Sequence, residues 1–440
     1  MLGTFADRPL SIRSIFEQGA RVHPRSVVVT YEGEAGSSTR TFAEIEAGAH
    51  RLAGALRALG VGPGDRVASL AWNHAAHLEA YFAVPSMGAV LVTLNLRLTA
   101  ESLAEIAEHA EPKVLLVDES LGGLAAGFVE EVPSLEHLVV IGDPARTPLD
   151  ATPYMELPAG APERFDWPEV DENDAAMMCY TTGTTGRPKG VAYSHRSTYI
   201  HSLMAAAPNA FLIGERDRIA RVVPMFYANA WGLPFTGWWM GADMRMPREF
   251  LQGPHLARLI AEERGTFVAG VPTVLDDLLT TAQAEGRDIT SLRLVNGGGS
   301  AIPPSLIERY LDAGIEMVQG WGMTETSPLV SISRPDKESA PEESVALRAM
   351  QGRPIHGVEM RIVGEDGAVL PWDGESVGEL EVRGPTITTS YYRQPAPERF
   401  DDGWLRTGDV GTIDPRGYLR LTDRLKDVIK SGGEWISSIE

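Results

Sequence analysis

The sequence predicts an α/β protein made of two doubly wound α/β subdomains and a small β-barrel-like subdomain. Short apolar runs alternate with helical patterns along the chain, and this alternation starts again after an irregular stretch. From about residue 359, short runs of alternating polarity are separated by Gly and Asp, which is typical of antiparallel strands. The length of 440 residues accommodates about three such units.

The first subdomain is predicted from alternating strands and helices. Apolar positions recur at three and four residues in 42–56, so this stretch is expected to form an amphipathic helix. Further helices are expected at 75–87 and 100–109, and buried strands at 67–71, 89–92, 113–117 and 138–141. Such units favour a mostly parallel sheet covered on both faces. The stretch 143–173 is rich in Pro, Asp and Glu, and it predicts a surface crossing to the next unit.

The second and third subdomains follow the same logic. In the second subdomain, strands are expected at 177–180, 266–269 and 292–295, and a helix is expected to end at 260–265. In the third, antiparallel strands are expected at 360–363, 378–383 and 417–421. The predicted boundaries are 1–170, 171–350 and 351–422. Residues 423–440 are predicted to be a hinge and the stub of a truncated C-terminal domain, because the chain stops at a Ser pair suited to capping a new helix.

Composition excludes several classes of function. The 39 Lys and Arg against 60 Asp and Glu give a net charge of −21, which disfavours nucleic acid as a partner. The single cysteine, Cys179, cannot form an internal disulfide or a Cys-ligated metal cluster, so a reducing, cytoplasmic setting is expected. No signal peptide and no transmembrane segment are expected either.

The most informative stretch runs from Thr181 to Gly190 and directly follows a predicted strand. Its glycines let the backbone approach a ligand closely, its threonines supply hydroxyls, and Lys189 supplies a positive charge for a polyphosphate. A Walker loop is excluded because Lys189 is followed by Gly190 and Val191 rather than by Ser or Thr. The alternative is a flexible Gly/Thr hairpin turn.

Five further motifs follow in order: Pro224–Trp231, Asn296–Ala301, Gln319–Thr326, Arg406–Asp409 and Asp423–Asp427. Together with the Gly/Thr loop, they resemble the acyl-adenylate-forming superfamily over nearly the whole chain. Within it, the sequence is most similar to medium- and long-chain fatty acyl-CoA synthetases. This resemblance implies ATP and AMP binding, Mg²⁺, coenzyme A as co-substrate and a small-molecule acid as substrate, with a homodimer as a possible assembly.

The resemblance also implies roles for individual residues. Thr181, Glu325 and Lys426 are expected to be catalytic, with Thr181 and Glu325 at the metal and Lys426 at the domain hinge. The acid is expected to contact Tyr227, Asn229, Trp231, Gly297 and Gly298. Nucleotide contacts are expected from Thr182, Gly183, Thr184, Thr185, Gly186, Lys189, Gly299, Gln319, Gly320, Trp321, Gly322, Thr324, Asp409, Arg424, Lys430 and Trp435.

Each role has a structural alternative. Glu325 could be a solvated loop glutamate, Trp321 a packing residue and Asp409 a turn aspartate. Lys426 could be an exposed hinge lysine without a chemical role. Gly320 and Gly322 favour the ligand-binding interpretation of Trp321, because they leave backbone room around its ring. His195 is expected to be structural or to support the site indirectly. Trp238 and Trp239 could wall the acyl site or belong to the core.

The implied reaction has two steps: a carboxylate attacks the α-phosphorus of ATP, releasing pyrophosphate, and a thiol then takes the acyl group from AMP. Because relatives continue for about one more domain, this 440-residue chain is expected to bind ATP or AMP but to adenylate poorly. Relatives usually carry His where Tyr227 stands, so the acid could differ. The alternatives are an enzyme that activates an unusual oxyacid, such as nitrite for an aryl amine, and a non-enzymatic nucleotide-binding protein.

Overall fold

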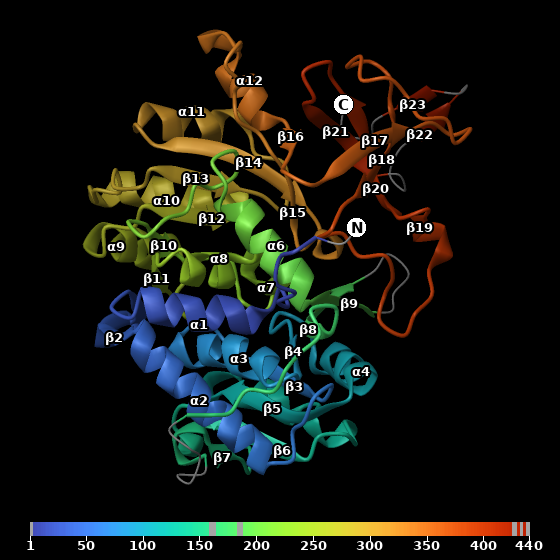
Figure 1. The fold of residues 1–440 in the computed structure, drawn as a ribbon. Helices are drawn as coiled ribbons and strands as arrows, with labels where there is room; N and C mark the ends of the chain where they lie inside the picture. Colours follow the sequence, from blue (N-terminus) through green and yellow to red (C-terminus); the bar gives the residue numbers. More distant parts are fainter. Residues whose placement is uncertain (1–2, 158–163, 183–187, 425–428, 432–433, 437–440) are drawn as a thin grey trace. The chain divides into compact units, whose positions relative to one another are not determined.

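The computed structural model describes residues 3–157, 164–182, 188–424, 429–431 and 434–436 (Figure 1). The chain forms two compact units. Unit 1 comprises residues 1–203, 214–216 and 224–249, and unit 2 comprises 204–213, 217–223 and 250–440. The units are interleaved along the chain rather than consecutive, and the boundaries at 170, 350 and 422 stay a prediction.

Unit 1 is built on a seven-stranded sheet with the order β7-β6-β5-β3-β4-β8-β9. All neighbouring pairs are parallel except β8 and β9, which form an antiparallel hairpin. The strands are β3 (Arg66–Leu70), β4 (Val90–Thr93), β5 (Pro112–Asp118), β6 (His137–Ile141), β7 (Thr152–Pro153), β8 (Ala175–Thr182) and β9 (Pro188–Ser194). A second ladder in this unit pairs β1 (Val27–Tyr31) with β2 (Ser37–Thr41) and β11 (Asp243–Met246).

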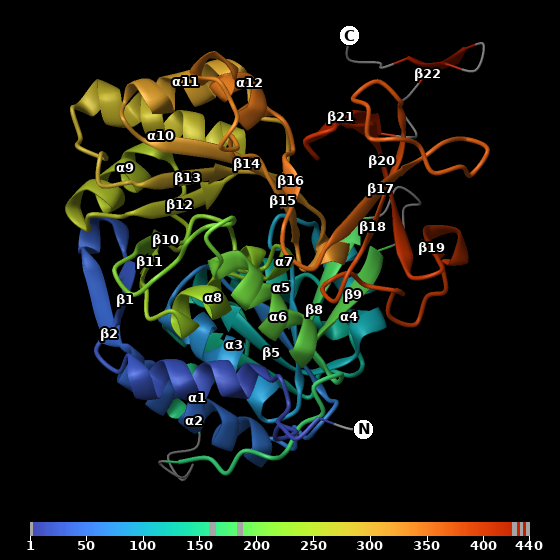
Figure 2. The ribbon, with the colours of Figure 1, turned by 45° about the horizontal axis from the view of Figure 1, so that its top comes forward.

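Local sequence explains the helices of unit 1. The longest is α2 (Phe42–Ala58), which begins at a capping box where Thr41 and Glu44 satisfy each other's backbone N–H groups. Helix α1 packs against it, as Figure 2 shows. The helices are α1 (Ile12–Val22), α2, α3 (Ala75–Ser86), α4 (Ala100–Ala110), α5 (Gly122–Ala126), α6 (His195–Ala206), α7 (Ala228–Trp231) and α8 (Leu233–Trp239).

An aromatic core holds α1, α2, α3 and α8 together. The ring of Trp238 stacks on Phe42, with centroids 4.0 Å apart and an interplanar angle of 9°. Phe16 and Phe82 pack around the same indole, whose Nε1–H donates to the carbonyl of Phe16 at 3.0 Å. Gly19 is required at this contact, because a Cβ there would lie 2.3 Å from Cδ1 of Trp238.

Unit 2 carries a second sheet in which β10, β12, β13 and β14 are parallel, and β15 and β16 follow antiparallel. Its helices bury an aliphatic core that includes Leu256, Leu275, Ile307 and Tyr310. The strands are β10 (Arg218–Ala220), β12 (Phe267–Gly270), β13 (Leu294–Gly297), β14 (Glu316–Gly322), β15 (Leu329–Ile332) and β16 (Arg353–Pro354), and the helices are α9 (Gly253–Glu262), α10 (Pro272–Glu285), α11 (Pro304–Asp312) and α12 (Ser344–Ala349).

The last part of unit 2 is a small antiparallel sheet. Its order is β17-β18-β20-β19, and β21 pairs with the other half of β20. The strands are β17 (Glu359–Val363), β18 (Gly378–Arg383), β19 (Phe400–Asp401), β20 (Trp404–Ile413) and β21 (Leu419–Arg424), followed by the hairpin of β22 (Ile429–Ser431) and β23 (Glu434–Ile436). The expected antiparallel strands at 360–363, 378–383 and 417–421 are confirmed to within a few residues.

The α/β class and most elements of unit 1 from residue 42 to residue 141 are confirmed. The prediction of a surface crossing at 143–173 is wrong at two positions, because Phe165 and Trp167 are 6% and 8% exposed. Their rings pack in the aromatic core, Trp167 at 5.9 Å from Phe16, and they anchor the crossing to unit 1. Within the described part of the chain, no helix combines the length and apolar character needed to cross a membrane.

Candidate active site

The Gly/Thr-rich segment connects the two strands of the β8–β9 hairpin. Thr181 pairs with Lys189 and Thr182 with Pro188, so the ends of the segment lie side by side. β8 and β9 therefore form a hairpin, as in the alternative interpretation of the sequence. A hairpin does not exclude a phosphate-binding loop at the end of β8. Gly183, Thr184, Thr185, Gly186 and the side chain of Thr182 lie outside the described residues, so their nucleotide contacts stay a prediction.

Asn229 of the predicted acyl segment is fixed to β8. The Sγ of Cys179 donates to its Oδ1 at 3.2 Å, and the Thr93 hydroxyl lies 3.2 Å from the same sulfur. Burial raises the pKa of the Cys179 thiol to about 11, so the group stays protonated as a donor. Asn229 is 5% exposed, whereas Tyr227 is 46% exposed. Thus only one of these two predicted acid contacts is open to solvent.

The backbone of this segment has an uncommon conformation. Five consecutive residues have positive φ: Ala228 (42°), Asn229 (52°), Ala230 (51°), Trp231 (56°) and Gly232 (69°). Left-handed backbone costs L-residues about 1–2 kcal/mol each, and such strain concentrates at functional sites. The run turns the chain from Tyr227 into α8 within one short left-handed turn.

Trp238 and Trp239 do not wall an acyl site. Trp238 has no exposed surface, and Trp239 donates its Nε1–H to Gln18 on α1 at 2.8 Å. Both are core residues, as the sequence alternative proposed. Trp231 is 9% exposed and stays a predicted acid contact.

In unit 2, the glycines of the predicted adenine and magnesium motifs are explained by protein contacts. A Cβ at Gly297 would lie 2.2 Å from Cδ1 of Ile302, and one at Gly322 would lie 1.7 Å from the carbonyl oxygen of Pro328. At Gly320 it would lie 2.9 Å from Oδ1 of Asn296. The argument that Gly320 and Gly322 leave room around Trp321 is therefore corrected: these two residues, and Gly297 as well, are Gly because neighbouring protein atoms occupy the space.

Asn296 and Gln319 stand beside these glycines. Gln319 is 2% exposed, and its Oε1 accepts from the backbone N–H of Ile302 at 2.9 Å, so it braces the loop after β13. Asn296 is 1% exposed, and its Oδ1 has no hydrogen-bond partner among the described residues. A buried amide without a partner is costly, which makes Asn296 a ligand-contact candidate that the site prediction left out. Gly298 donates its N–H to Gly270, and Gly299 has a φ of 81°.

Trp321, Asp409 and Arg424 form a connected group. The indole Nε1–H of Trp321 donates to Oδ2 of Asp409 at 3.2 Å, and Nε of Arg424 lies 2.6 Å from Oδ1. Burial raises the pKa of Asp409, against the opposing effects of Arg424 and Trp321. The prediction that Asp409 is available as a bidentate acceptor is therefore refined, since both carboxylate oxygens already have protein partners.

Glu325 is buried, so it is not the solvated loop glutamate of the alternative, and its role at the metal stays a prediction. It is 6% exposed, and its Oε1 accepts from the hydroxyl of Tyr391 at 2.8 Å. The carbonyl of Glu325 accepts from the backbone N–H of Thr388 at 2.9 Å. Burial, with the Glu325 charge beside it, raises the pKa of Tyr391, which keeps the phenol as donor. Tyr391 was missed in the sequence because only the fold brings it next to Glu325.

The chemistry of this carboxylate fits Mg²⁺. Among the described residues, no group of three or more His, Cys, Asp or Glu side chains is placed to hold a metal ion. A single buried glutamate is nevertheless a hard oxygen ligand, and Mg²⁺ is commonly held by one or two carboxylates together with substrate phosphates.

Three predicted residues lie at or beyond the limit of the description. Lys426 is outside the described residues, and so are the side chains of Lys430 and Trp435, whose backbones belong to the β22–β23 hairpin. The structure supports the structural role of His195: it is fully buried, and its Nδ1 accepts from the N–H of Ile12 at 3.3 Å.

Comparison with known proteins gives consistent results. A family model described as AMP-binding enzyme matches residues 16–392. The whole chain is 41% identical to a medium-chain-fatty-acid–CoA ligase of Ectopseudomonas oleovorans and covers 82% of that protein. It is 43% identical, over 99% of its length, to a long-chain-fatty-acid–CoA ligase of Thermus thermophilus, of which it covers 81%. The anthranilate CoA ligase AuaEII in complex with anthranoyl-AMP has a similar structure, with a TM-score of 0.87, 25% identity and coverage of 98% of this chain and 80% of the ligase.

Proposed function

The chain belongs to the family of AMP-binding enzymes and is an AMP-forming acid–thiol ligase, and we propose that its acid is a medium- or long-chain fatty acid. The two fatty-acid ligases share 41% and 43% of this sequence, and their names support an aliphatic acid over an aryl acid. Coenzyme A is the proposed acceptor, and the cytoplasm stays the predicted location.

One observation supports the nucleotide side of this proposal most directly. The Trp321–Asp409 hydrogen bond fixes the edge of the indole ring, so the ring orientation is set before a ligand arrives. An adenine can stack on such a ring face, and a carboxylate beside it can accept from ribose hydroxyls. In this proposal Arg424 either keeps its ion pair with Asp409 while the ribose binds the same carboxylate, or leaves Asp409 and contacts the phosphates.

The proposed chemistry has two displacement steps. A carboxylate oxygen of the fatty acid attacks the α-phosphorus of ATP, the bond to pyrophosphate breaks, and acyl-AMP forms. The CoA sulfur, after losing its proton, attacks the acyl carbon, and the bond to the AMP oxygen breaks. The protein mainly orients the reactants and offsets phosphate charge, which is the part proposed for the Gly/Thr loop and Lys189.

Glu325 would hold Mg²⁺, and the resemblance adds Thr181. The ion would supply positive charge beside the phosphates of ATP. Tyr391, through its hydrogen bond, positions the Glu325 carboxylate for this task.

Affinity for non-hydrolysable acyl-adenylate analogues tests the proposed acid independently of turnover. Calorimetry would compare octanoyl, palmitoyl and benzoyl analogues on the 440-residue chain. We expect tighter binding of the fatty-acyl compounds, and preference for the benzoyl analogue would contradict the proposal. Asp409→Asn should weaken all three, whereas Asp401→Asn, an exposed change in the same small sheet, should weaken none.

A turnover assay covers the remaining expectations. ATP-to-AMP conversion would be measured with octanoate, palmitate, benzoate and nitrite, each with and without coenzyme A, and with nitrite also in the presence of an aryl amine. AMP formation only with nitrite and an aryl amine would favour the oxyacid alternative. Substrate-dependent pyrophosphate exchange tests the prediction that this chain adenylates poorly, and near-normal exchange would contradict it.

A further inference from the structure

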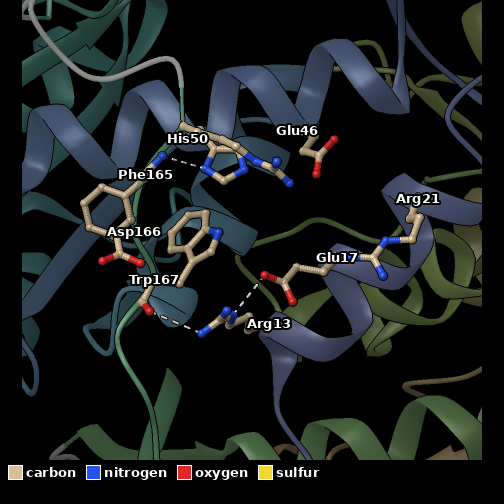
Figure 3. A pocket seen from close by; sticks show the side chains of 9 residues that line it. Arg13, Glu17, Arg21, Glu46, His50, Phe165, Asp166 and Trp167 are labelled. Atoms are coloured by element: carbon tan, nitrogen blue, oxygen red, sulfur yellow. Dashed lines mark hydrogen bonds and ion pairs between the residues drawn. The ribbon is translucent and has the colours of Figure 1, made fainter.

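Unit 1 contains a cavity outside the predicted nucleotide and acid sites. It measures about 460 Å³ and opens between α1, α2 and the segment Arg164–Trp167 (Figure 3). Small-molecule sites usually measure about 300–1,000 Å³, so this volume suits a small metabolite. None of the residues that line it belongs to the predicted nucleotide, metal or acid contacts.

Two N–H groups form the floor of this cavity. The rings of His50 and Trp167 lie 4.9 Å apart, and the two residues are 5% and 8% exposed. The Nε1–H of Trp167 is buried and has no acceptor among the described residues. Figure 3 shows both rings beside the open space. An indole N–H that is buried without a partner is unusual in a settled core.

His50 provides the second donor. Its Nδ1 accepts from the backbone N–H of Phe165 at 3.0 Å, so the proton of the neutral ring is on Nε2. Burial, assisted by the Arg164 guanidinium, lowers the pKa of His50 and keeps the ring neutral at pH 7. No acceptor for Nε2–H is found in the described part of the chain.

The rim adds charge of both signs. Arg13 is already used, because it pairs with Glu17 at 3.0 Å and donates to the carbonyls of Trp167 and Pro168. Within the described residues, Arg21 and Arg164 form no ion pair or hydrogen bond, which leaves two guanidinium groups for a ligand. Glu46 and Asp166 line the same space. Burial raises the pKa of Glu46, and the charges of Arg164 and Arg21 oppose this rise.

We propose that this cavity binds a small polar metabolite that carries a carboxylate or phosphate group. The oxyanion accepts from Nε2–H of His50, from Nε1–H of Trp167 and from the guanidinium groups of Arg21 and Arg164. Glu46 accepts from a hydroxyl or ammonium group of the same ligand. A fatty acid is disfavoured because charged side chains, and not aliphatic ones, surround the space.

Calorimetric titration in saturating AMP tests this site while AMP occupies the nucleotide site. The probes are inorganic phosphate, L-malate and L-glutamate, which separate phosphate from carboxylate recognition and hydroxyl from ammonium. We expect at least one probe to bind the wild-type chain with a dissociation constant of about 1 mM or lower. Failure of all three to bind up to about 20 mM would overturn the proposal.

Substitutions assign the binding to this cavity. Trp167→Phe removes only the indole N–H, and His50→Asn keeps an acceptor for Phe165 while removing Nε2–H. Each should weaken the probe about tenfold, because each deletes a hydrogen bond to a charged group. Arg21→Gln should weaken it similarly and is an exposed change that leaves folding intact, whereas Arg25→Gln, the matched control outside the cavity, should have no effect.

Unchanged affinity in Arg21→Gln and Trp167→Phe would also overturn the proposal, since the probe would then bind elsewhere. AMP affinity and thermal midpoint, measured on the same samples, show that each variant is folded. Because neither readout requires turnover, failure of this proposal is distinguishable from failure of the proposed ligase function.

Discussion

The Nε1–H of Trp321 donates to Oδ2 of Asp409 at 3.2 Å, and this bond joins two motifs that lie 88 residues apart in the sequence. Trp321 lies where β14 pairs antiparallel with β15 in one sheet of unit 2, and Asp409 lies within β20 of the other. The bond therefore fixes a ring face and a carboxylate relative to each other, although the two come from different sheets.

Asp409→Asn should reduce AMP affinity about tenfold or more, because the neutral amide loses the charge-assisted bonds of the carboxylate. Calorimetry with AMP would measure this loss. Asp401→Asn is the control, since Asp401 is exposed on the neighbouring strand. Equal affinity of the Asp409 variant and the wild type would contradict the assignment of Asp409 to the ribose.

Tyr391→Phe should weaken binding of MgATP about tenfold while leaving metal-free AMP unaffected. The change removes the O–H that positions Glu325, and Glu325 is expected to act only through the metal. The two affinities would be measured on the same preparation, with Tyr392→Phe as the adjacent control. A parallel loss for AMP would show that Tyr391 supports the fold of the site and not the metal ligand.

Gly19→Ala should lower the free energy of unfolding by about 1–3 kcal/mol, because the added methyl would clash with Cδ1 and the carbonyl oxygen of Trp238. Urea unfolding followed by circular dichroism checks this. Gly123→Ala serves as the control, since a Cβ there meets nothing within 4 Å. Equal stability of the two variants would mean that α1 and α8 can separate without cost.

The buried thiol of Cys179 should resist alkylation in the folded chain. Burial raises its pKa to about 11, and Thr93 and Asn229 lie against the sulfur. Mass spectrometry after iodoacetamide treatment at pH 8 should show modification only in denaturant. Rapid labelling of the folded chain would show that β8 opens readily next to the acyl segment.

Stability should fall as the pH is lowered from 6.5 toward 5. Burial lowers the pKa values of His77, His195 and His201 from 6.5 to about 4. Below pH 6.5 these histidines therefore bind protons in the unfolded chain but stay neutral in the folded chain. Each histidine then contributes a slope of up to about 1.4 kcal/mol per pH unit. Urea midpoints above pH 5, where most carboxylates stay ionised, measure the slope, and His201→Gln should reduce it.

Much of the fold could be predicted because local signals were strong. Helix α2 was expected at 42–56 and lies at Phe42–Ala58, since its apolar period and its Thr41–Glu44 capping box agree. The strand expected at 67–71 lies at Arg66–Leu70, because a short apolar run there becomes buried. No helix or strand was predicted within the first 41 residues, and α1 forms there because its Phe16 and Gly19 fit the distant Trp238.

The site was less predictable because its contacts join distant parts of the chain. The Glu325–Tyr391 and Trp321–Asp409 pairs are separated by 66 and 88 residues, and no local pattern records them. The glycines beside Trp321 were misinterpreted for the same reason, since the atoms that require them belong to Asn296 and Pro328. The burial of Phe165 and Trp167 was not predicted, because the surrounding stretch is polar and has no regular pattern.

The left-handed turn from Ala228 to Gly232 restricts how acid preference can be altered by engineering or by evolution. All five residues have positive φ, a conformation that β-branched residues rarely adopt. Substitutions to Val, Ile or Thr are therefore not tolerated at these positions. Tyr227, with a φ of −108° and 46% exposure, carries no such restriction. Libraries that seek new acids should therefore begin with all amino acids at Tyr227 and keep the turn itself unchanged.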